Sequence, residues 1–218
     1  MHHTGSTAII ANGQIDDLQA LLPSIQRHER IVAIDGGLVY CQQGNLIPHF
    51  IIGDFDSCPS ELLDKYNAIP KKTLPKDKDQ TDLEVAIEEE WKRGVSSITL
   101  YAAWGKRVDH SLTNALFLSR YPFKLKIETE SEILFAIQGR VELPCQVGQT
   151  ISLIPLYGPA KGITTSGLKW ELKKGMLDQN FIGISNESLK STVTIDIEKG
   201  TLLWCQNRCD VCKRVSSL

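Results

Sequence analysis

Residues 50–87 read FIIGDFDSCPSELLDKYNAIPKKTLPKDKDQTDLEVAI, and this stretch carries the clearest indication of how the N-terminal half folds. It opens with a short apolar run, continues through an acidic loop, and ends in a segment whose apolar residues have helical spacing. Thr81 and Glu84 form the S/T-x-x-E pattern of a helix capping box, and Gly94 marks the end of the predicted helix. A buried strand followed by a capped helix is typical of an α/β domain with a mostly parallel sheet.

The same alternation extends to both sides of this stretch. Three further runs, TAIIANG (7–13), RIVAIDGG (30–37) and SITLYAAWG (97–105), are almost continuously apolar, as is typical of parallel strands covered on both faces. A second helix is predicted over residues 109–120, with Leu112, Ala115, Leu116 and Ser119 facing inward and Pro122 beyond its end.

From about residue 128 the helical spacing stops. Short apolar runs separated by Gly, Pro and Asn follow, and they predict a small antiparallel sandwich or barrel. We therefore expect a mostly parallel α/β sheet domain over residues 1–127 and an antiparallel β-sandwich domain over residues 128–218.

The charge balance argues against several classes of partner. The 218 residues carry 24 Lys and Arg against 26 Asp and Glu, which gives no electrostatic reason to expect a nucleic acid or an anionic membrane. No apolar run reaches the roughly 20 residues of a membrane-spanning helix. The N-terminus also lacks the cationic start and the apolar stretch of a secretory signal. We expect a cytoplasmic protein without nucleic-acid or membrane partners.

Three of the six cysteines, Cys205, Cys209 and Cys212, lie near the C-terminus. Cys209 and Cys212 have the spacing of metal ligands, but a zinc site needs four ligands and no second pair completes the set. A cytosolic setting keeps thiols reduced, so free thiols are the favoured interpretation and a metal in this tail is the alternative.

Acidic residues follow the apolar runs where each strand is predicted to end. Asp35 follows one run, Asp54 and Asp56 follow the next, and Asp79 and Asp82 lead into the capped helix. Ligands of open parallel sheets bind beyond the carboxyl ends of the strands, so we expect these side chains to share one crevice. Carboxylates repel one another at close range, and Mg²⁺ prefers carboxylate and phosphate oxygens. The cluster therefore predicts a magnesium–phosphate site.

Each acidic motif also has a purely structural interpretation. Asp35-Gly36-Gly37 is a common turn signal, Asp82 is a favourable charge in the first turn of a helix, and an Asp-x-Asp loop is often solvated. The magnesium interpretation depends on all three motifs occurring together at the ends of strands and the start of a helix.

The segment WGKRVDHSLTNAL (104–116) supplies the positive charge that a triphosphate needs. Gly105 allows a close backbone approach, and Lys106 and Arg107 can meet phosphate oxygens. Asp109 and Asn114 lie at the start of the helix that follows.

Taken in order, these motifs resemble those of the thiamine pyrophosphokinase family. The resemblance covers almost the whole chain and rests on DGG (35–37), GDFDS (53–57), DQTD (79–82), RVDHSLTN (107–114), SLIPL (152–156), TSGLKW (165–170) and SNE (185–187). It implies a kinase that transfers the pyrophosphoryl group of ATP to the hydroxyl group of thiamine, giving thiamine diphosphate and AMP. It also implies a homodimer whose active sites lie at the subunit interface.

The resemblance implies roles for individual residues. The catalytic set would be Asp54, Asp56, Asp79 and Asp82, with Asp54, Asp56 and Asp82 as the Mg²⁺ ligands. The contacts to ATP would come from Asp35, Gly36, Ser57, Arg107, Asp109 and Asn114. Asp54 and Asp79 are both candidates for the base that accepts the hydroxyl proton.

On the thiamine side the resemblance implies Trp170, with Ser185 and Asn186 near it. The default interpretation of Trp170 is a core residue of the second domain. A Trp face, however, attracts a cation such as the thiazolium ring by roughly 0.5–2 kcal/mol, which supports the binding role.

Lysines depart from the expected pattern at two places. Lys106 stands where the family usually has Gly, and Lys76 and Lys78 interleave the acidic element.

Two other functions also remain open. A Mg²⁺-dependent nucleotide-sugar transferase also places an Asp-x-Asp after a strand, but leaves Trp170 without a role. A non-catalytic thiamine- or nucleotide-binding module would have no need to retain all the acidic residues.

Overall fold

The structure, a computed structural model, describes residues 5–56 and 58–208. It has a mixed α/β fold, as predicted, and forms two compact units. The first unit contains the residues up to Leu112 together with Ile127–Glu130, and the second begins at Thr113 and contains the rest of the described chain. Among the described residues, no helix has the length and apolar character needed to cross a membrane.

The first unit is built on parallel strands. These are β1 (Ser6–Ile10), β2 (Arg30–Ile34), β3 (Phe50–Gly53), β4 (Lys71–Thr73) and β5 (Ser97–Tyr101), and they lie in the order β4-β3-β2-β1-β5. Every pairing among them is parallel. The four apolar runs predicted as strands are therefore confirmed. The sequence of β4, KKT, has no apolar run, so its pairing with β3 at the sheet edge was not predictable. A sixth strand, β6 (Leu125–Glu128), contains residues of both units.

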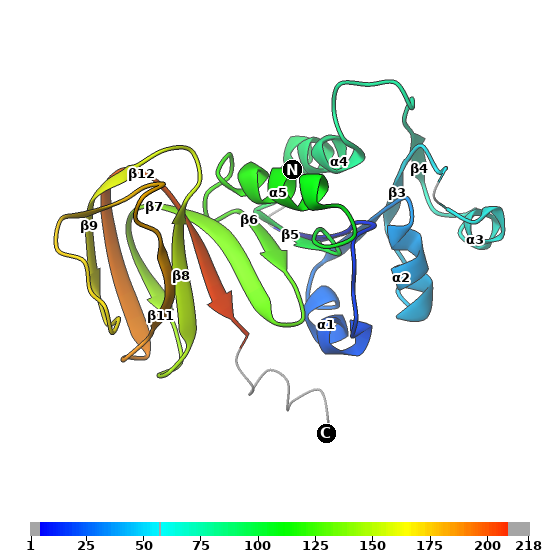
Figure 1. Ribbon diagram of the computed structural model, residues 1–218. Helices are drawn as coiled ribbons and strands as arrows, with labels where there is room; N and C mark the ends of the chain where they lie inside the picture. The colour runs from blue at the N-terminus through cyan, green and yellow to red at the C-terminus, as the bar shows by residue number, and fades with distance from the viewer. Residues whose placement is uncertain (1–4, 57, 209–218) are drawn as a thin grey trace. The chain divides into compact units, whose positions relative to one another are not determined.

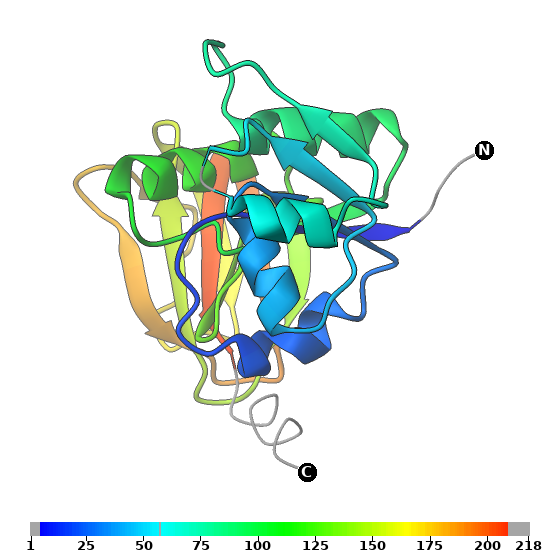
Figure 2. The same ribbon diagram turned by 90° about the vertical axis from the view of Figure 1, so that its right-hand side faces the viewer.

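Helices cover both faces of this parallel sheet. They are α1 (Leu18–Ile25), α2 (Gly37–Gln43), α3 (Ser60–Lys65) and α4 (Asp82–Lys92). A further helix, α5 (Val108–Leu118), contains residues of both units. α1 and α2 lie on one face and α4 on the other in both views (Figure 1 and Figure 2). Leu21, Ile25 and Leu38 of the first two helices pack with Ile10 and Ile51 of the strands, and all five side chains are fully buried.

The capping box predicted for α4 is confirmed. Thr81 Oγ1 accepts a hydrogen bond of 3.2 Å from the backbone N–H of Glu84, and the Glu84 carboxylate accepts one of 3.2 Å from the N–H of Thr81. These two bonds satisfy N–H groups that the start of a helix leaves without partners. They also place Asp82 at the first position of the helix.

A buried carboxylate anchors the other end of α4. Leu83, Ala86 and Ile87 face the core, and Glu90 continues the same face with 2% of its surface exposed. Its carboxylate accepts hydrogen bonds from Thr7 Oγ1 at 2.9 Å and from Arg30 Nε at 3.0 Å. The helix is thereby tied to β1 and β2, which limits how far it can slide or rotate.

The inward face of α5 differs from the prediction. Leu112 is 58% exposed rather than inward, whereas Ser111, Ala115 and Leu118 are buried. Apolar residues occur on several faces of this helix, so their spacing alone does not choose one. Ser111 helps to decide it, because its hydroxyl accepts from the Gly105 N–H and donates to the Arg107 carbonyl, both at 3.0 Å.

The second unit contains antiparallel strands. These are β7 (Glu132–Pro144), β8 (Thr150–Pro155), β9 (Ala160–Ser166), β10 (Gly175–Leu177), β11 (Gly183–Glu187) and β12 (Thr192–Asn207). β12 pairs with β7 along its length, with β9 through its first part and with β8 through its second part. The buried core between these strands includes Phe135, Ile195 and Trp204.

β7 and β12 are each longer than the apolar runs suggested. The runs EILFAIQG and RVELP join into β7, and STVTIDIEKG and TLLWCQ join into β12. Gly139 and Gly200 lie at these junctions with φ of 64° and 106°. Glycine adopts such angles without steric cost, so both strands change direction there without ending.

Candidate functional site

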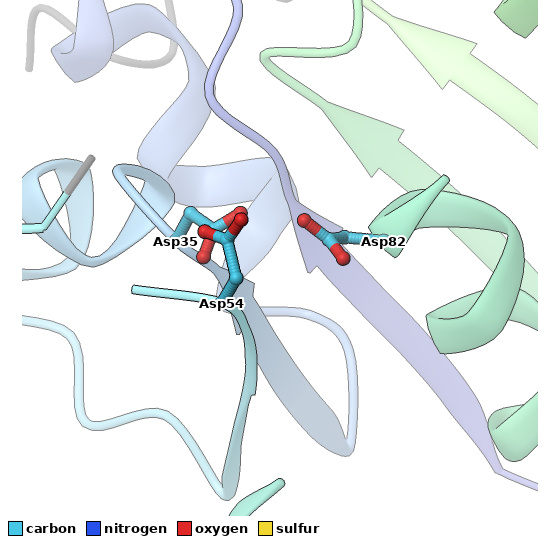
Figure 3. A group of neighbouring side chains, drawn as sticks. All are labelled: Asp35, Asp54 and Asp82. Carbon is cyan, nitrogen blue, oxygen red and sulfur yellow. The ribbon is translucent and has the colours of Figure 1, made fainter. Parts of the chain in front are cut away.

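Three carboxylates of the first unit meet beyond the carboxyl ends of β2 and β3. Asp35 follows β2, Asp54 follows β3, and Asp82 begins α4. One oxygen of each lies within 4.8 Å of the corresponding oxygens of the other two. In Figure 3, Asp82 points from its helix toward Asp35 and Asp54. We call Asp35, Asp54 and Asp82 the acidic cluster.

The backbone around the acidic cluster adopts conformations that are unusual for side-chain-bearing residues. Asp35 and Phe55 have φ of 43° and 63°. The N–H of Phe55 donates a hydrogen bond of 3.0 Å to Asp35 Oδ1, which holds the loop after β3 against the loop after β2. A side chain at Gly53 would collide with the Asp35 carboxylate, and its φ of 153° disfavours one as well. Gly53 is therefore needed for the two loops to approach.

Burial and neighbouring carboxylates make ionisation of Asp35 unfavourable. Burial, the hydrogen bond with Asp82 and the negative charges of Asp82 and Asp54 raise the pKa of Asp35 from 3.8 to about 7, against the lowering effect of the Phe55 N–H. A nearby cation would remove this cost. The donor set consists of carboxylate oxygens at mutual distances that one ion can span, and such hard oxygen donors fit Mg²⁺.

A lysine already supplies one positive charge to the acidic cluster. The Lys78 ammonium lies 2.7 Å from Asp82 Oδ1, and the two side chains are only 17% and 19% exposed. Lys78 also donates to the Pro75 carbonyl at 2.9 Å. This single charge offsets only part of the charge of three carboxylates, so the site keeps its attraction for a divalent cation.

Other predicted acidic residues lie outside the acidic cluster. Asp56 donates its backbone N–H to Asp54 Oδ1 at 3.1 Å, but its own carboxylate pairs with Lys76 at 3.3 Å on the surface. Asp79 is exposed in the loop before α4. The family resemblance implies Asp54, Asp56 and Asp82 as the ligands. In the structure, Asp35 rather than Asp56 is the third carboxylate beside Asp54 and Asp82. Ser57, predicted to contact ATP, lies outside the described residues.

A second polar group lies at the carboxyl ends of β1, β2 and β5. Lys106, with φ of 57°, donates its ammonium to Asn12 Oδ1 at 3.1 Å. A side chain at Gly36 would collide with Asn12, so Gly36 and Asn12 are direct neighbours. Sequence reasoning missed Asn12, although Asn12-Gly13 directly follows the strand TAII. A polar residue directly after a predicted parallel strand is a candidate for the binding crevice, and this signal could have identified Asn12.

The other residues predicted to contact the nucleotide have different environments. Arg107 pairs with Asp109 at 2.5 Å, and both side chains are exposed. Each group favours the charged form of the other, which raises the pKa of Arg107 and lowers that of Asp109. Asn114, by contrast, is 7% exposed within α5. Arg107 and Asp109 are therefore the members of this set that solvent and a ligand can reach.

The second unit contains a cavity of about 340 Å³. Its lining includes Leu153, Leu168, Trp170, Phe181, Ile184 and Asn186. The Asn186 side chain accepts from the Trp170 N–H at 3.1 Å and donates to the Trp170 carbonyl at 2.8 Å. Two of the three predicted thiamine contacts, Trp170 and Asn186, therefore lie on one cavity wall and fix each other's position.

The Trp170 ring is exposed and has a lysine cation over it. Trp170 is 60% exposed, although the default expectation for this aromatic was a core position. The Lys169 ammonium lies 5.0 Å from the centre of the Trp170 ring, and Lys169 also pairs with Glu187 at 3.1 Å. A positive charge thus already lies over the ring, as cation–π attraction favours. Ser185, the third predicted contact, is exposed in β11 with φ of 56°, and its N–H donates to Ser152 Oγ at 3.0 Å.

The C-terminal cysteines give no metal site among the described residues. Cys205 lies in β12, and burial raises the pKa of its thiol to about 12. Metals bind the thiolate, which the burial of this thiol disfavours. Cys209 and Cys212 lie outside the described residues.

Comparison with known proteins gives consistent matches over both halves of the chain. The family model described as "Thiamin pyrophosphokinase, catalytic domain" matches residues 22–130, and "Thiamin pyrophosphokinase, vitamin B1 binding domain" matches residues 139–202. The Thiamine pyrophosphokinase of Bacillus subtilis is 26% identical over 207 residues, which cover 91% of this chain and 97% of the relative. Thiamine pyrophosphokinase 1 of Arabidopsis thaliana is 30% identical over 172 residues, covering 72% of this chain and 64% of the relative.

Solved structures show the same fold at lower identity. The crystal structure of the Bacillus subtilis thiamine pyrophosphokinase superposes with a TM-score of 0.83 at 22% identity, covering 94% of this chain and 99% of that one. The yeast thiamin pyrophosphokinase also gives a TM-score of 0.83, at 16% identity, over 100% of this chain and 90% of that one.

Proposed function

The chain belongs to the thiamine pyrophosphokinase family. We propose that the acidic cluster holds the metal that acts on ATP in the family reaction, and that the cavity beside Trp170 binds thiamine. That reaction transfers the pyrophosphoryl group of ATP to the hydroxyl group of thiamine and gives thiamine diphosphate and AMP. The chain is accordingly an enzyme, a transferase of thiamine diphosphate biosynthesis, with ATP and thiamine as its substrates.

The acidic cluster is the proposed Mg²⁺ site, and the approach of its three carboxylates within 4.8 Å is the observation that carries the proposal. Mg²⁺ held there would supply the positive charge that phosphoryl transfer needs on the phosphate oxygens. Asp56 as a further ligand stays a prediction, because its carboxylate would first have to leave Lys76. Through its N–H bond to Asp54, Asp56 also helps to orient that carboxylate.

The triphosphate is proposed to bind at the same end of the parallel sheet. Lys106 and Arg107 provide charge-assisted hydrogen bonds to phosphate oxygens, and the backbone of Gly36 allows close approach. Asn12 holds the Lys106 ammonium at 3.1 Å and so limits where it can reach. The roles of Ser57, Asp109 and Asn114 toward ATP stay predictions.

Thiamine is proposed to bind against Trp170 and Asn186. Asn186 makes two hydrogen bonds with the Trp170 backbone and so holds this wall in place. The exposed Trp170 ring would meet the thiazolium cation, and the adjoining apolar cavity would take the rest of the molecule. Ser185 stays a predicted contact.

The chemistry is a substitution at phosphorus. The thiamine hydroxyl oxygen forms a bond to the β-phosphorus of ATP, and the bond from that phosphorus to the oxygen bridging to the α-phosphate breaks, so AMP leaves. The hydroxyl proton passes to a carboxylate, for which Asp54 and Asp79 are the candidates. Asp54 belongs to the acidic cluster, whereas Asp79 is exposed beside the start of α4.

We propose the same domain and assembly plan that the sequence suggested. Residues 1–127 would form the α/β catalytic domain, and residues 128–218 the β-sandwich domain that binds thiamine and dimerises. The parallel pairings of β1–β5 and the antiparallel pairings of β7–β12 support this division. Exposed apolar side chains at Phe181, Ile182 and Ile184 support a homodimer with its active sites at the subunit interface. The cytoplasmic location stays a prediction.

The decisive experiment mixes the purified protein with ATP, Mg²⁺ and thiamine and resolves the nucleotide products. We expect AMP that depends on thiamine and is matched by thiamine diphosphate. ADP as the product would indicate transfer of a single phosphate instead. The Asp54→Asn variant should lose turnover while it retains thiamine binding, a separation that a non-catalytic binding module would not show.

A further inference from the structure

We propose that Lys78 and the catalytic metal compete for Asp82, and that this competition makes metal binding depend on the nucleotide. The inference rests on the proposed function, because it concerns the Mg²⁺ and ATP of the same site. It assigns Lys78 a positioning role through Asp82, rather than contact with the reacting atoms.

The Lys78–Asp82 ion pair differs from the surface pairs nearby. Its N–O distance is 2.7 Å and its side chains are 17% and 19% exposed, whereas Lys76 and Asp56 pair at 3.3 Å with 70% and 50% exposed. Exposed pairs contribute little, while charges partly removed from water interact more strongly. Lys78 is also held by the Pro75 carbonyl at 2.9 Å, so its ammonium has a defined position.

In that position the ammonium partly neutralises the acidic cluster through Asp82. Asp82 contributes an oxygen within 4.8 Å of those of Asp35 and Asp54. A divalent cation bound by these oxygens would lie close to the Lys78 ammonium and repel it. A free divalent ion must therefore weaken the Lys78–Asp82 pair, and this loss opposes its binding.

A metal–nucleotide complex does not meet the same opposition. It brings phosphate oxygens to the acidic cluster, and a displaced ammonium can form charge-assisted hydrogen bonds with them. The Lys78 ammonium then pairs with a phosphate oxygen in place of the Asp82 carboxylate, so its charge is not left without a partner. The expected result is weak binding of the free ion, strong binding of the metal–nucleotide complex, and a larger difference between the two than the carboxylates alone would give.

The test measures metal binding directly, with Mn²⁺ as a paramagnetic substitute for Mg²⁺. Electron paramagnetic resonance of the full-length protein reports the free Mn²⁺, and circular dichroism confirms that each variant is folded. Lys78→Met removes the competing charge and keeps most of the length of the side chain. Lys72→Met is the matched control, since Lys72 pairs with Glu89 at 3.1 Å, away from the acidic cluster.

Without nucleotide, we expect Lys78→Met to bind Mn²⁺ about tenfold more tightly than the parent, the scale expected when a competing ion pair partly removed from water is lost. Lys72→Met should match the parent. With a non-hydrolysable α,β-methylene analogue of ATP, the gain in Mn²⁺ affinity should be smaller in Lys78→Met than in the parent. Lys78→Gln should follow Lys78→Met, and it replaces that variant if Met prevents folding.

Equal or weaker Mn²⁺ binding by Lys78→Met and Lys78→Gln would overturn the competition. The Asp54→Asn variant separates this outcome from a failure of the proposed site. If the parent binds Mn²⁺ and Asp54→Asn does not, the site stands and only the role of Lys78 is lost. If the parent and Asp54→Asn bind Mn²⁺ alike, the proposed site is wrong and the inference falls with it.

Discussion

The backbone N–H of Phe55 donates a hydrogen bond of 3.0 Å to Oδ1 of Asp35. This bond joins the loops that leave β2 and β3, and both residues adopt positive φ to form it. It holds one oxygen of Asp35 while Asp54 and Asp82 approach from neighbouring segments. The unusual backbone conformation costs of order 1–3 kcal/mol per residue, and it brings like charges together. This combination is typical of a functional site.

Replacing Asp35 by Asn should stabilise the protein at neutral pH while removing metal binding. The pKa of Asp35 is raised from 3.8 to about 7, so the folded state holds the proton more tightly than the unfolded state. Stability is therefore lost as the pH rises from 4 toward 7, and the loss is complete above pH 7. Asn keeps the acceptor for Phe55 and tolerates positive φ.

Thermal unfolding without metal should therefore show a gain in Tm for Asp35→Asn that grows between pH 4 and pH 7 and then levels off. Added Mg²⁺ should raise the Tm of the parent but not that of the variant. Asp64→Asn is the control, because Asp64 is exposed in α3 and has no proposed role in the site. A gain in Tm that is the same at pH 4 and pH 8 would contradict this account of Asp35.

Replacing Gly53 by Ala should abolish turnover. The added methyl group would collide with the Asp35 carboxylate, so the loop after β3 and the acidic cluster could not keep their positions. Gly94→Ala is the matched control, since Gly94 also has positive φ, of 82°, but has no atom within 4 Å of the added group. We expect the control to lose about 1 kcal/mol of stability and keep its activity. Steady-state kinetics and urea unfolding measure the two effects.

Replacing Trp170 by Ala should weaken thiamine binding and leave ATP binding unchanged. Loss of a cation–π contact of roughly 0.5–2 kcal/mol corresponds to a rise in KM for thiamine of about 2- to 30-fold. Phe, which keeps an aromatic face, should show a smaller rise. Tyr157→Ala removes another exposed aromatic ring of the second unit, outside the cavity, and serves as the control. An equal rise in the KM for ATP would argue against a specific thiamine contact.

Replacing Glu90 by Gln should destabilise the fold and lower activity together. Glu90 is 2% exposed and accepts from Thr7 and Arg30, so its loss leaves the Arg30 charge poorly compensated. We expect a cost of about 3 kcal/mol in the free energy of unfolding. Weaker binding of Mn²⁺ should accompany it, because α4 carries Asp82. Glu89→Gln, which breaks only partly exposed pairs with Lys72 and Lys92, should cost less than about 1 kcal/mol.

Much of the fold follows from local patterns in the sequence. The apolar runs of β1, β2, β3 and β5 and the capping box of α4 could be predicted because strand burial and helix capping depend on neighbouring residues. The inward face of α5 could not, because its apolar residues lie on several faces and Ser111, bound to the loop before the helix, helps to set its rotation.

For the site, the order of residues along the chain shows which acidic residues end strands or begin a helix, and so which could share the crevice of a parallel sheet. The folded structure is needed to see that Asp35 joins Asp54 and Asp82 while Asp56 turns to Lys76. It also brought Asn12 beside Lys106 and gave Lys78 its place on Asp82. The physical reason is that residue type and spacing place a backbone, whereas the direction of a carboxylate depends on the charges that other segments bring within a few ångströms.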